Sequence, residues 1–229
     1  MTQTAPDAPE AHAAAREPWW HRHVELIVVV LLGIVSVATA YTSFQSALYG
    51  GQSDDKVAQS EDAGTEAESL YLEGNQQYVQ DTQTLQQLRL LDVAAQAGDP
   101  VASAQYDELY FVGVSDPLDT AIERAAAMDA AEPDFWHDPQ ADDDYQQALF
   151  GAYSDKDDES DALWEQGDAL GGQGDTLGFY TALMAISLFL LGVAAVVKRA
   201  LMRWILIAVA GGVFLVTAVL TATIPFVWI

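Results

Sequence analysis

The sequence predicts an all-α membrane protein with three transmembrane helices, one near the N-terminus and two in a C-terminal hairpin, and an acidic helical-bundle ectodomain between them. Two observations predict this class. Long uncharged, apolar stretches lie near both ends of the 229-residue chain. Residues 50–175 between them hold 30 Asp and Glu against four Lys and Arg, whereas the rest of the chain has four acids and five bases. The whole net charge of −25 therefore belongs to one block.

Residues 1–23 are predicted to form a cytoplasmic tail and an interfacial anchor. The tail as far as Pro18 has no hydrophobic periodicity, which indicates disorder. Trp19 and Trp20 then adjoin the basic run His21-Arg22-His23, and tryptophan beside cations is typical of a membrane interface.

Residues 24–46 are predicted to be the first transmembrane helix. No charged residue occurs from Leu26 to Ser53, which is long enough to cross a hydrocarbon core of about 30 Å at about 1.5 Å per residue. A rival interpretation is a cleaved signal peptide, because Ala38-Thr39-Ala40 has the small-x-small form of a cleavage site. We favour a retained span because the uncharged stretch continues well beyond Ala40.

Residues 47–175 are predicted to form the acidic extracytoplasmic domain, which begins with a long helix. From Glu66 to Ala97 the sequence has no proline, and Tyr71, Tyr78 and Leu85 repeat at intervals of seven on one face. Gly98-Asp99-Pro100 should end this helix, because Gly suits the position after a helix and proline disfavours helix before it.

Shorter helices should follow. We expect a helix over Val101–Val112, then a start at Asp116-Pro117 and a break at Glu132-Pro133, with Phe135-Trp136 docking as a loop. Asp138-Pro139 repeats the start signal and opens a last helix carrying Tyr145, Leu149 and Tyr153.

Two interruptions are expected in that last helix. Residues 155–161 contain no apolar side chain, which favours a loop. Gly171-Gly172-Gln173-Gly174 is expected to be a flexible joint ahead of the membrane.

Residues 176–197 and 204–229 are predicted to be the second and third spans, joined by a basic cytoplasmic turn over 198–203. Small residues on the spans are expected to pack between helices, and the threonines of the last span are expected to bond to their own backbone. The residues concerned are Gly33, Ser36, Ala40, Ala208, Gly212, Ala218 and Ala222, and Thr217, Thr221 and Thr223.

The basic residues predict the orientation. Arg16 and Arg22 precede the first span, and Lys198, Arg199 and Arg203 join the last two. In a three-span protein both groups lie on one side, and the positive-inside rule assigns that side to the cytoplasm. Residues 47–175 and the C-terminus are then extracytoplasmic.

The sequence offers few groups for chemistry. Asp155, Asp157, Glu159 and Asp161 have the spacing of the first ligands of a calcium loop, and they are the candidate metal ligands. The pattern has Ser160 where such a loop needs glycine and Gln166 where it needs glutamate. His137 is the single histidine of the acidic block, and the chain has no cysteine. We therefore expect no enzyme, no cofactor and no catalytic residue.

The charge also limits the partners. Binding nucleic acid requires clustered Lys and Arg, which the acidic block lacks, so we expect the lipid bilayer and proteins, including further copies of the chain, as partners. The 22 Asp against three Lys are halophile-like, because an Asp-rich surface stays hydrated in high salt. High-GC codon usage is the alternative origin of this composition.

The layout resembles uncharacterised prokaryotic three-span membrane proteins, of the domain-of-unknown-function type, with an extracytoplasmic helical region. The residues that carry the resemblance are 19–26 (WWHRHVEL), 43–46 (SFQS) and 66–71 (EAESLY). The resemblance implies architecture and no activity. The sequence thus favours a membrane-anchored interaction or assembly module. The alternatives are a channel or transporter subunit and a cation-responsive sensor.

Overall fold

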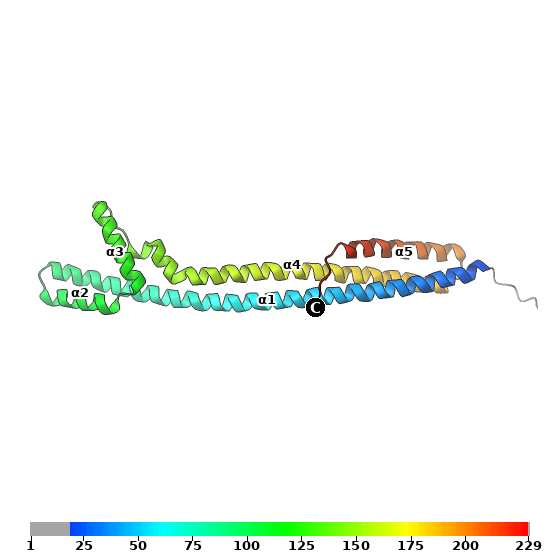
Figure 1. Ribbon diagram of the computed structural model, residues 1–229, viewed down its shortest axis with the longest axis horizontal. Helices are drawn as coiled ribbons and strands as arrows, with labels where there is room; N and C mark the ends of the chain where they lie inside the picture. Colours follow the sequence, from blue (N-terminus) through cyan, green and yellow to red (C-terminus); the bar gives the residue numbers. More distant parts are fainter. Residues whose placement is uncertain (1–18, 229) are drawn as a thin grey trace, which may run out of the picture. The chain divides into compact units, whose positions relative to one another are not determined.

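The computed structural model describes residues 19–228, and all the regular structure in this range is helical, as predicted. Figure 1 shows the elements in order. They are α1 (Trp19–Gln96), α2 (Pro100–Gly113), α3 (Asp116–Ala131), the 3₁₀ helix η1 (Pro139–Ala141), α4 (Asp143–Val196) and α5 (Ala200–Ala222). The predicted disordered tail, residues 1–18, lies outside the described residues.

The chain divides into two compact units, to which α1 and α4 both contribute. We call residues 1–50 and 172–229 the apolar unit, and residues 51–171 the acidic unit. Three helices, α1, α4 and α5, are long and apolar enough to cross a membrane.

The apolar unit has a core of medium-sized side chains from three helices. Val28 and Val35 of α1 pack with Leu191 of α4 and Ile207 of α5. The side chains that face outward are also large and apolar, including Val37 at 72% and Phe189 at 70% exposure. Several buried side chains are polar instead: Thr42, Gln45, Ser187, Arg203, Thr217 and Thr221. A surface as apolar as this is typical of helices surrounded by lipid.

The predicted packing of small residues is wrong for most of the positions. Gly33, Ser36, Ala40, Ala208, Gly212 and Ala222 are exposed, and of the set Ala218 alone packs against the core. The buried face of α1 instead follows the seven-residue row Val28, Val35 and Thr42, because β-branched side chains fill the space between the helices.

The threonines of α5 follow the prediction in part. Thr217 and Thr223 donate to the Val213 and Leu220 carbonyls of their own helix. Thr221 departs from it, because its Oγ1 is buried without a hydrogen-bond partner among the described residues.

The C-terminal segment is shorter in helix than expected and contacts α1. α5 ends at Ala222, so residues after it are not part of a helix reaching 229. The Gln45 side-chain amide forms two hydrogen bonds with the Val227 backbone. Its Nε2 donates to the Val227 carbonyl at 3.3 Å, and its Oε1 accepts from the Val227 N–H at 3.1 Å. The Tyr49 hydroxyl donates to the Pro225 carbonyl at 2.7 Å. These bonds satisfy backbone groups that the missing helical turns would have paired.

In the acidic unit, α1 and α4 form an antiparallel pair held by serine and glycine. Ser60 and Ser160 each donate a side-chain hydrogen bond to the other's carbonyl, at 2.8 and 2.9 Å. The Ser53 hydroxyl donates to the Gly167 carbonyl at 2.7 Å. Such contacts require backbones to approach closely, which small residues permit.

This close pairing overturns both predicted interruptions of the last helix. Residues 155–161 are helical within α4, and so are Gly171-Gly172-Gln173-Gly174. In residues 155–161 the small side chain of Ser160 forms the contact with α1, so the helix needs no large apolar residue there. The lack of such residues therefore does not indicate a loop.

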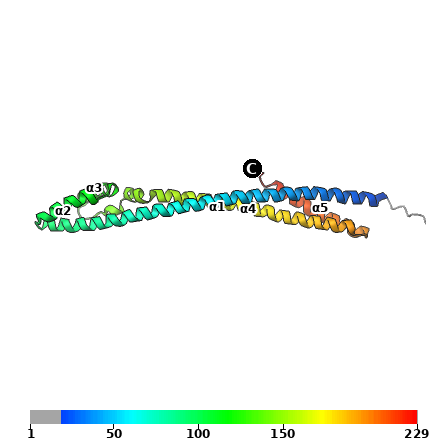
Figure 2. The same ribbon diagram turned by 90° about the horizontal axis from the view of Figure 1, so that it is seen from below.

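The end of α1 and the boundaries of α2 and α3 agree with their signals to within a residue or two, whereas Asp138-Pro139 opens the short η1 and α4 begins only at Asp143. Gly98, at φ +95°, ends α1, and Asp99 caps α2 through the Val101 N–H. Ser115, rather than the expected Asp116, caps α3, which ends before Pro133. In both views α2 folds back along the last turns of α1 (Figure 1, Figure 2).

Three of the four cations of the acidic unit join separate segments. Arg124 of α3 bonds Asp142 and Asp144 at the start of α4, at 2.6 and 2.8 Å. Lys156 of α4 pairs with Glu66 of α1 at 3.0 Å. Asp142 also caps α4 by accepting from the Tyr145 N–H, and its side chain is only 8% exposed. Arg89, the third of these cations, belongs to the candidate site.

Candidate functional site

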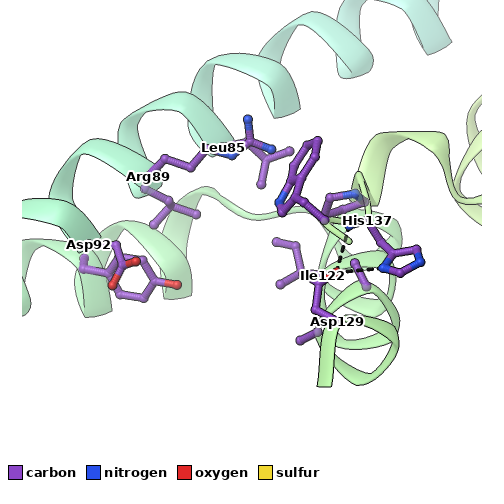
Figure 3. A pocket seen from close by; sticks show the side chains of 12 residues that line it. Leu85, Arg89, Asp92, Ile122, Asp129 and His137 are labelled. Atoms are coloured by element: carbon purple, nitrogen blue, oxygen red, sulfur yellow. Dashed lines mark hydrogen bonds and ion pairs between the residues drawn. The ribbon is translucent and has the colours of Figure 1, made fainter. Parts of the chain in front are cut away.

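A pocket of about 190 Å³ lies in the acidic unit where the end of α1 meets α2, α3 and the loop before η1. Figure 3 shows Arg89 and Asp92 of α1 on one side and Ile122 and Asp129 of α3 on the other. The complete lining is Leu85, Leu88, Arg89, Asp92, Tyr106, Ile122, Ala125, Ala126, Asp129, Trp136, His137 and Pro139. The pocket is thus an apolar floor edged by two acids, two aromatic rings, an imidazole and one guanidinium.

Trp136 and Arg89 form the open edge of the pocket. The guanidinium carbon lies 4.7 Å from the centre of the indole ring, a cation–π arrangement, and Arg89 also faces Asp138 at 3.9 Å. These contacts hold the loop against α1 but leave Trp136 62% and Phe135 68% exposed. The prediction that Phe135 and Trp136 both dock onto the bundle is therefore only partly correct. Trp136 contacts α1 through one face of its ring, and Phe135 remains largely exposed.

His137 is fixed by Asp129 from the end of α3. Oδ1 of Asp129 lies 2.7 Å from His137 Nδ1 and accepts the His137 backbone N–H at 2.8 Å (Figure 3). The side-chain and backbone hydrogen bonds from His137 lower the pKa of Asp129 below its ordinary value. Asp129 therefore remains an anion and holds the loop in place.

Tyr106 contributes a phenol that keeps its proton. Burial, followed by the negative charges of Asp92 and Asp107, raises the pKa of Tyr106 above its ordinary value. A phenol in this state donates a hydrogen bond and is a poor nucleophile or base.

The pocket is small, and its lining includes one acid–imidazole pair. Its volume of about 190 Å³ is below the range of roughly 300–1,000 Å³ that small-molecule sites occupy. The His137–Asp129 pair lacks a serine, threonine or cysteine neighbour among the lining residues.

The Asp129 interaction predicts a specific pH dependence of stability. Because its folded-state pKa is lowered, Asp129 stabilises the fold above the unfolded-state pKa of about 3.9. This contribution is lost as the pH falls through the lower, folded-state pKa. The melting temperature of the wild type should therefore exceed that of Asp129→Asn at neutral pH, and the difference should shrink in acid below about pH 4.

Thermal melts of both proteins across this pH range make the comparison, and the difference between them removes the effect of the other carboxylates. A gap that is constant with pH would contradict the role of the Asp129 carboxylate.

A second polar cluster is buried at the centre of the acidic unit. Asp81 of α1 is 1% exposed, and its carboxyl group accepts hydrogen bonds from three other side chains. Ser115 and Tyr145 donate to Oδ2 at 2.9 and 3.0 Å, and Gln77 donates to Oδ1 at 2.9 Å. Burial and then the bond to Asp81 raise the pKa of Tyr145. The cluster joins α1, the cap of α3 and α4 around the buried Asp81 and Tyr145, which indicates a structural role.

The candidate metal ligands lie on a continuous helix. Asp155, Asp157, Glu159 and Asp161 are exposed side chains of α4, and alternate residues of a helix point in widely different directions. Glu159 pairs with Lys156 at 3.0 Å. Among residues 19–228 no three Asp, Glu, His or Cys side chains converge as a metal site would require.

The sequence contains a signal for Asp81, which interrupts the apolar periodicity of α1. Tyr78, Asp81, Leu85 and Leu88 follow the 3-4 spacing of a buried helix face, so a polar residue stands at a core position. The pocket has no comparable signal in the sequence, because its lining comes from four separate segments.

Comparison with known proteins adds no assignment to this geometry. No protein-family model, curated protein or solved structure matches the chain.

Proposed function

We propose that this chain is a three-span membrane protein that presents its acidic unit outside the cytoplasm as a protein-interaction module. The observation that carries the proposal is the small acid-edged pocket beside two exposed aromatic side chains, Phe135 and Trp136. Tryptophan and arginine, here Trp136 and Arg89, are the residues over-represented where protein interfaces gain most of their affinity.

The elements that line the pocket carry further exposed apolar side chains. Large apolar side chains stay exposed throughout residues 90–136, although this part of the chain is rich in acids. They are Leu90, Val93, Val101, Phe111, Val112, Met128, Phe135 and Trp136, and Phe111 reaches 88% exposure. Exposed apolar groups with polar neighbours are typical of docking surfaces.

The chemistry of the pocket indicates the kind of partner. Asp92 and Asp129 bring two carboxylates to the cavity against the one guanidinium of Arg89, which already lies over the indole of Trp136. We infer a protein that inserts one lysine or arginine side chain and surrounds it with apolar contacts. No chemical transformation is part of this function.

The membrane assignment is supported by the apolar unit. Three of its helices have the length and composition of spans, and their outward side chains are apolar. The cations before and at the start of α1 and those at the turn from α4 to α5 then lie on the cytoplasmic side.

A pair of matched variants tests the interaction. A photo-activated crosslinker is placed at Phe111 of the full chain in native membranes, in the wild-type background and in Phe135→Ser/Trp136→Ser. We expect crosslinking to a partner to fall about tenfold or more in the double variant, because central aromatic residues typically contribute about 2 kcal/mol or more each. The control Leu72→Ser/Trp164→Ser removes side chains of similar exposure, 64% and 54%, elsewhere on the unit. Equal loss in both variants, or in neither, would reject this surface as the interface.

A further inference from the structure

Arg203 is a buried cation in the first turn of α5. Arg203 is only 8% exposed. The Nε and Nη2 atoms of its guanidinium are buried without a hydrogen-bond partner in the described part of the chain. The sequence predicts a basic cytoplasmic turn over residues 198–203, but the turn is shorter, because α5 already begins at Ala200.

The guanidinium lies at one end of the apolar core. Arg203 shares the buried face of α5 with Ile207 and Ala210, which follow it by one and two turns. Ile207 and Ala210 pack with Val24 from the start of α1 and Ala194 from the end of α4. Arg203 is therefore at the level where α4 ends, α5 begins and α1 enters the unit.

Nothing described in the apolar unit neutralises this charge. Its described acids are Glu25 and Asp175, which are both exposed, and neither forms an ion pair with Arg203. A guanidinium stays protonated and carries five N–H donors, and a buried charge without a partner is strongly unfavourable. The site therefore calls for an anion with several acceptor oxygens.

We propose that Arg203 binds the phosphate of an anionic phospholipid headgroup. The planar fork of N–H groups matches two phosphate oxygens, and Arg203 stands where a span meets the headgroup layer. The exposed neighbours Lys198 and Arg199 add attraction for a lipid of net negative charge. The inference depends on the membrane location proposed above but not on the protein-interaction surface.

The test uses the purified full chain in detergent, depleted of lipid. Phosphatidylglycerol, phosphatidylcholine and inorganic phosphate are added separately, and bound lipid is counted by native mass spectrometry alongside the melting temperature. We expect one tightly held phosphatidylglycerol and a raised melting temperature, with weaker retention of phosphatidylcholine. A melting shift with inorganic phosphate alone would identify free phosphate as the ligand and overturn the assignment to lipid.

Variants decide whether Arg203 itself forms the site. Arg203→Gln should weaken phosphatidylglycerol binding about tenfold or more, because the phosphate loses a hydrogen bond from a charged group. Lys198→Gln should weaken the binding only a few-fold, because Lys198 adds only long-range attraction. Arg203→Lys keeps the charge without the fork and should bind at an intermediate level, which provides the comparison if Arg203→Gln does not fold.

Equal losses for Arg203→Gln and Lys198→Gln, or no lipid retained by the wild type, would overturn the site. Self-association abolished by Arg203→Gln without a change in lipid binding would assign the anion to a second copy and would also overturn it. Crosslinking from Phe111 should be unchanged in Arg203→Gln, so failure of the lipid site and failure of the interaction module can be told apart.

Discussion

Replacing Asp81 with alanine is expected to lower the local unfolding free energy of the acidic unit by about 3–5 kcal/mol, a large effect for a polar substitution. The change strands three donors at once, the hydroxyls of Ser115 and Tyr145 and the amide of Gln77. Tyr145 is 1% exposed, so water cannot replace the lost acceptor. Each buried group left unpaired costs about 1–3 kcal/mol.

Two companion variants separate the hydrogen bonds from the charge and from the position on α1. Asp81→Asn keeps the shape, and the hydroxyls can rotate to accept from its amide, so a loss of about 1–2 kcal/mol is expected. Asp92→Ala removes an exposed carboxyl group that bonds Gln96 of its own helix and should change stability by less than about 0.5 kcal/mol. Hydrogen exchange of the amides around Ser115 and Tyr145 in the full chain provides the measurement. Equal protection in Asp81→Ala and Asp92→Ala would contradict a structural role for the cluster.

Gly74→Ala should destabilise the acidic unit by about 1–3 kcal/mol, although alanine is the better helix former. A Cβ at this position would overlap the Leu149 carbonyl oxygen of α4 and press on the Phe150 ring at 3.1 Å. The obstacle is backbone, which cannot rotate away, so α1 and α4 must separate.

A second glycine of the same helix and the same unit provides the control, because its replacement by alanine should raise the stability. A methyl group added at Gly51 of α1 would meet nothing within 4 Å beyond the local backbone of its own helix, so Gly51→Ala should stabilise by about 0.5–1 kcal/mol. Thermal unfolding followed by circular dichroism compares the two. A stabilised Gly74→Ala would show that the two helices do not approach closely there.

The helices that depend on local signals could be predicted from the sequence. The stop at Gly98-Asp99-Pro100 and the break at Glu132-Pro133 act through backbone geometry within a few residues, and both occur where expected. The apolar stretches likewise predicted the three candidate spans, since length and hydropathy are additive properties of a segment.

Features that depend on the partner helix could not be predicted in this way. Residues 155–161 looked like a loop because a helix was expected to need large apolar side chains, whereas Ser160 bonds directly to the Ser60 backbone. Small residues give no hydrophobic signal, and their value appears only when a second backbone lies close enough to bond.

The same reason explains the errors in the apolar unit. The sequence cannot say which of several apolar faces is turned inward, so the exposed small residues of α1 and α5 were assigned to the interior. The sequence places Arg203 in the turn over residues 198–203, because a charge inside a membrane span is unfavourable. Its burial follows from its register with Ile207, one turn further along α5.

A reporter fused at residue 130, within α3, tests the orientation of the acidic unit most directly. Fusions of an enzyme active only outside the cytoplasm and of one active only inside are compared at this position and in the turn at Lys198. We expect external activity at residue 130 and internal activity at Lys198. Internal activity at residue 130 would contradict this orientation, because the interaction surface would then face the cytoplasm.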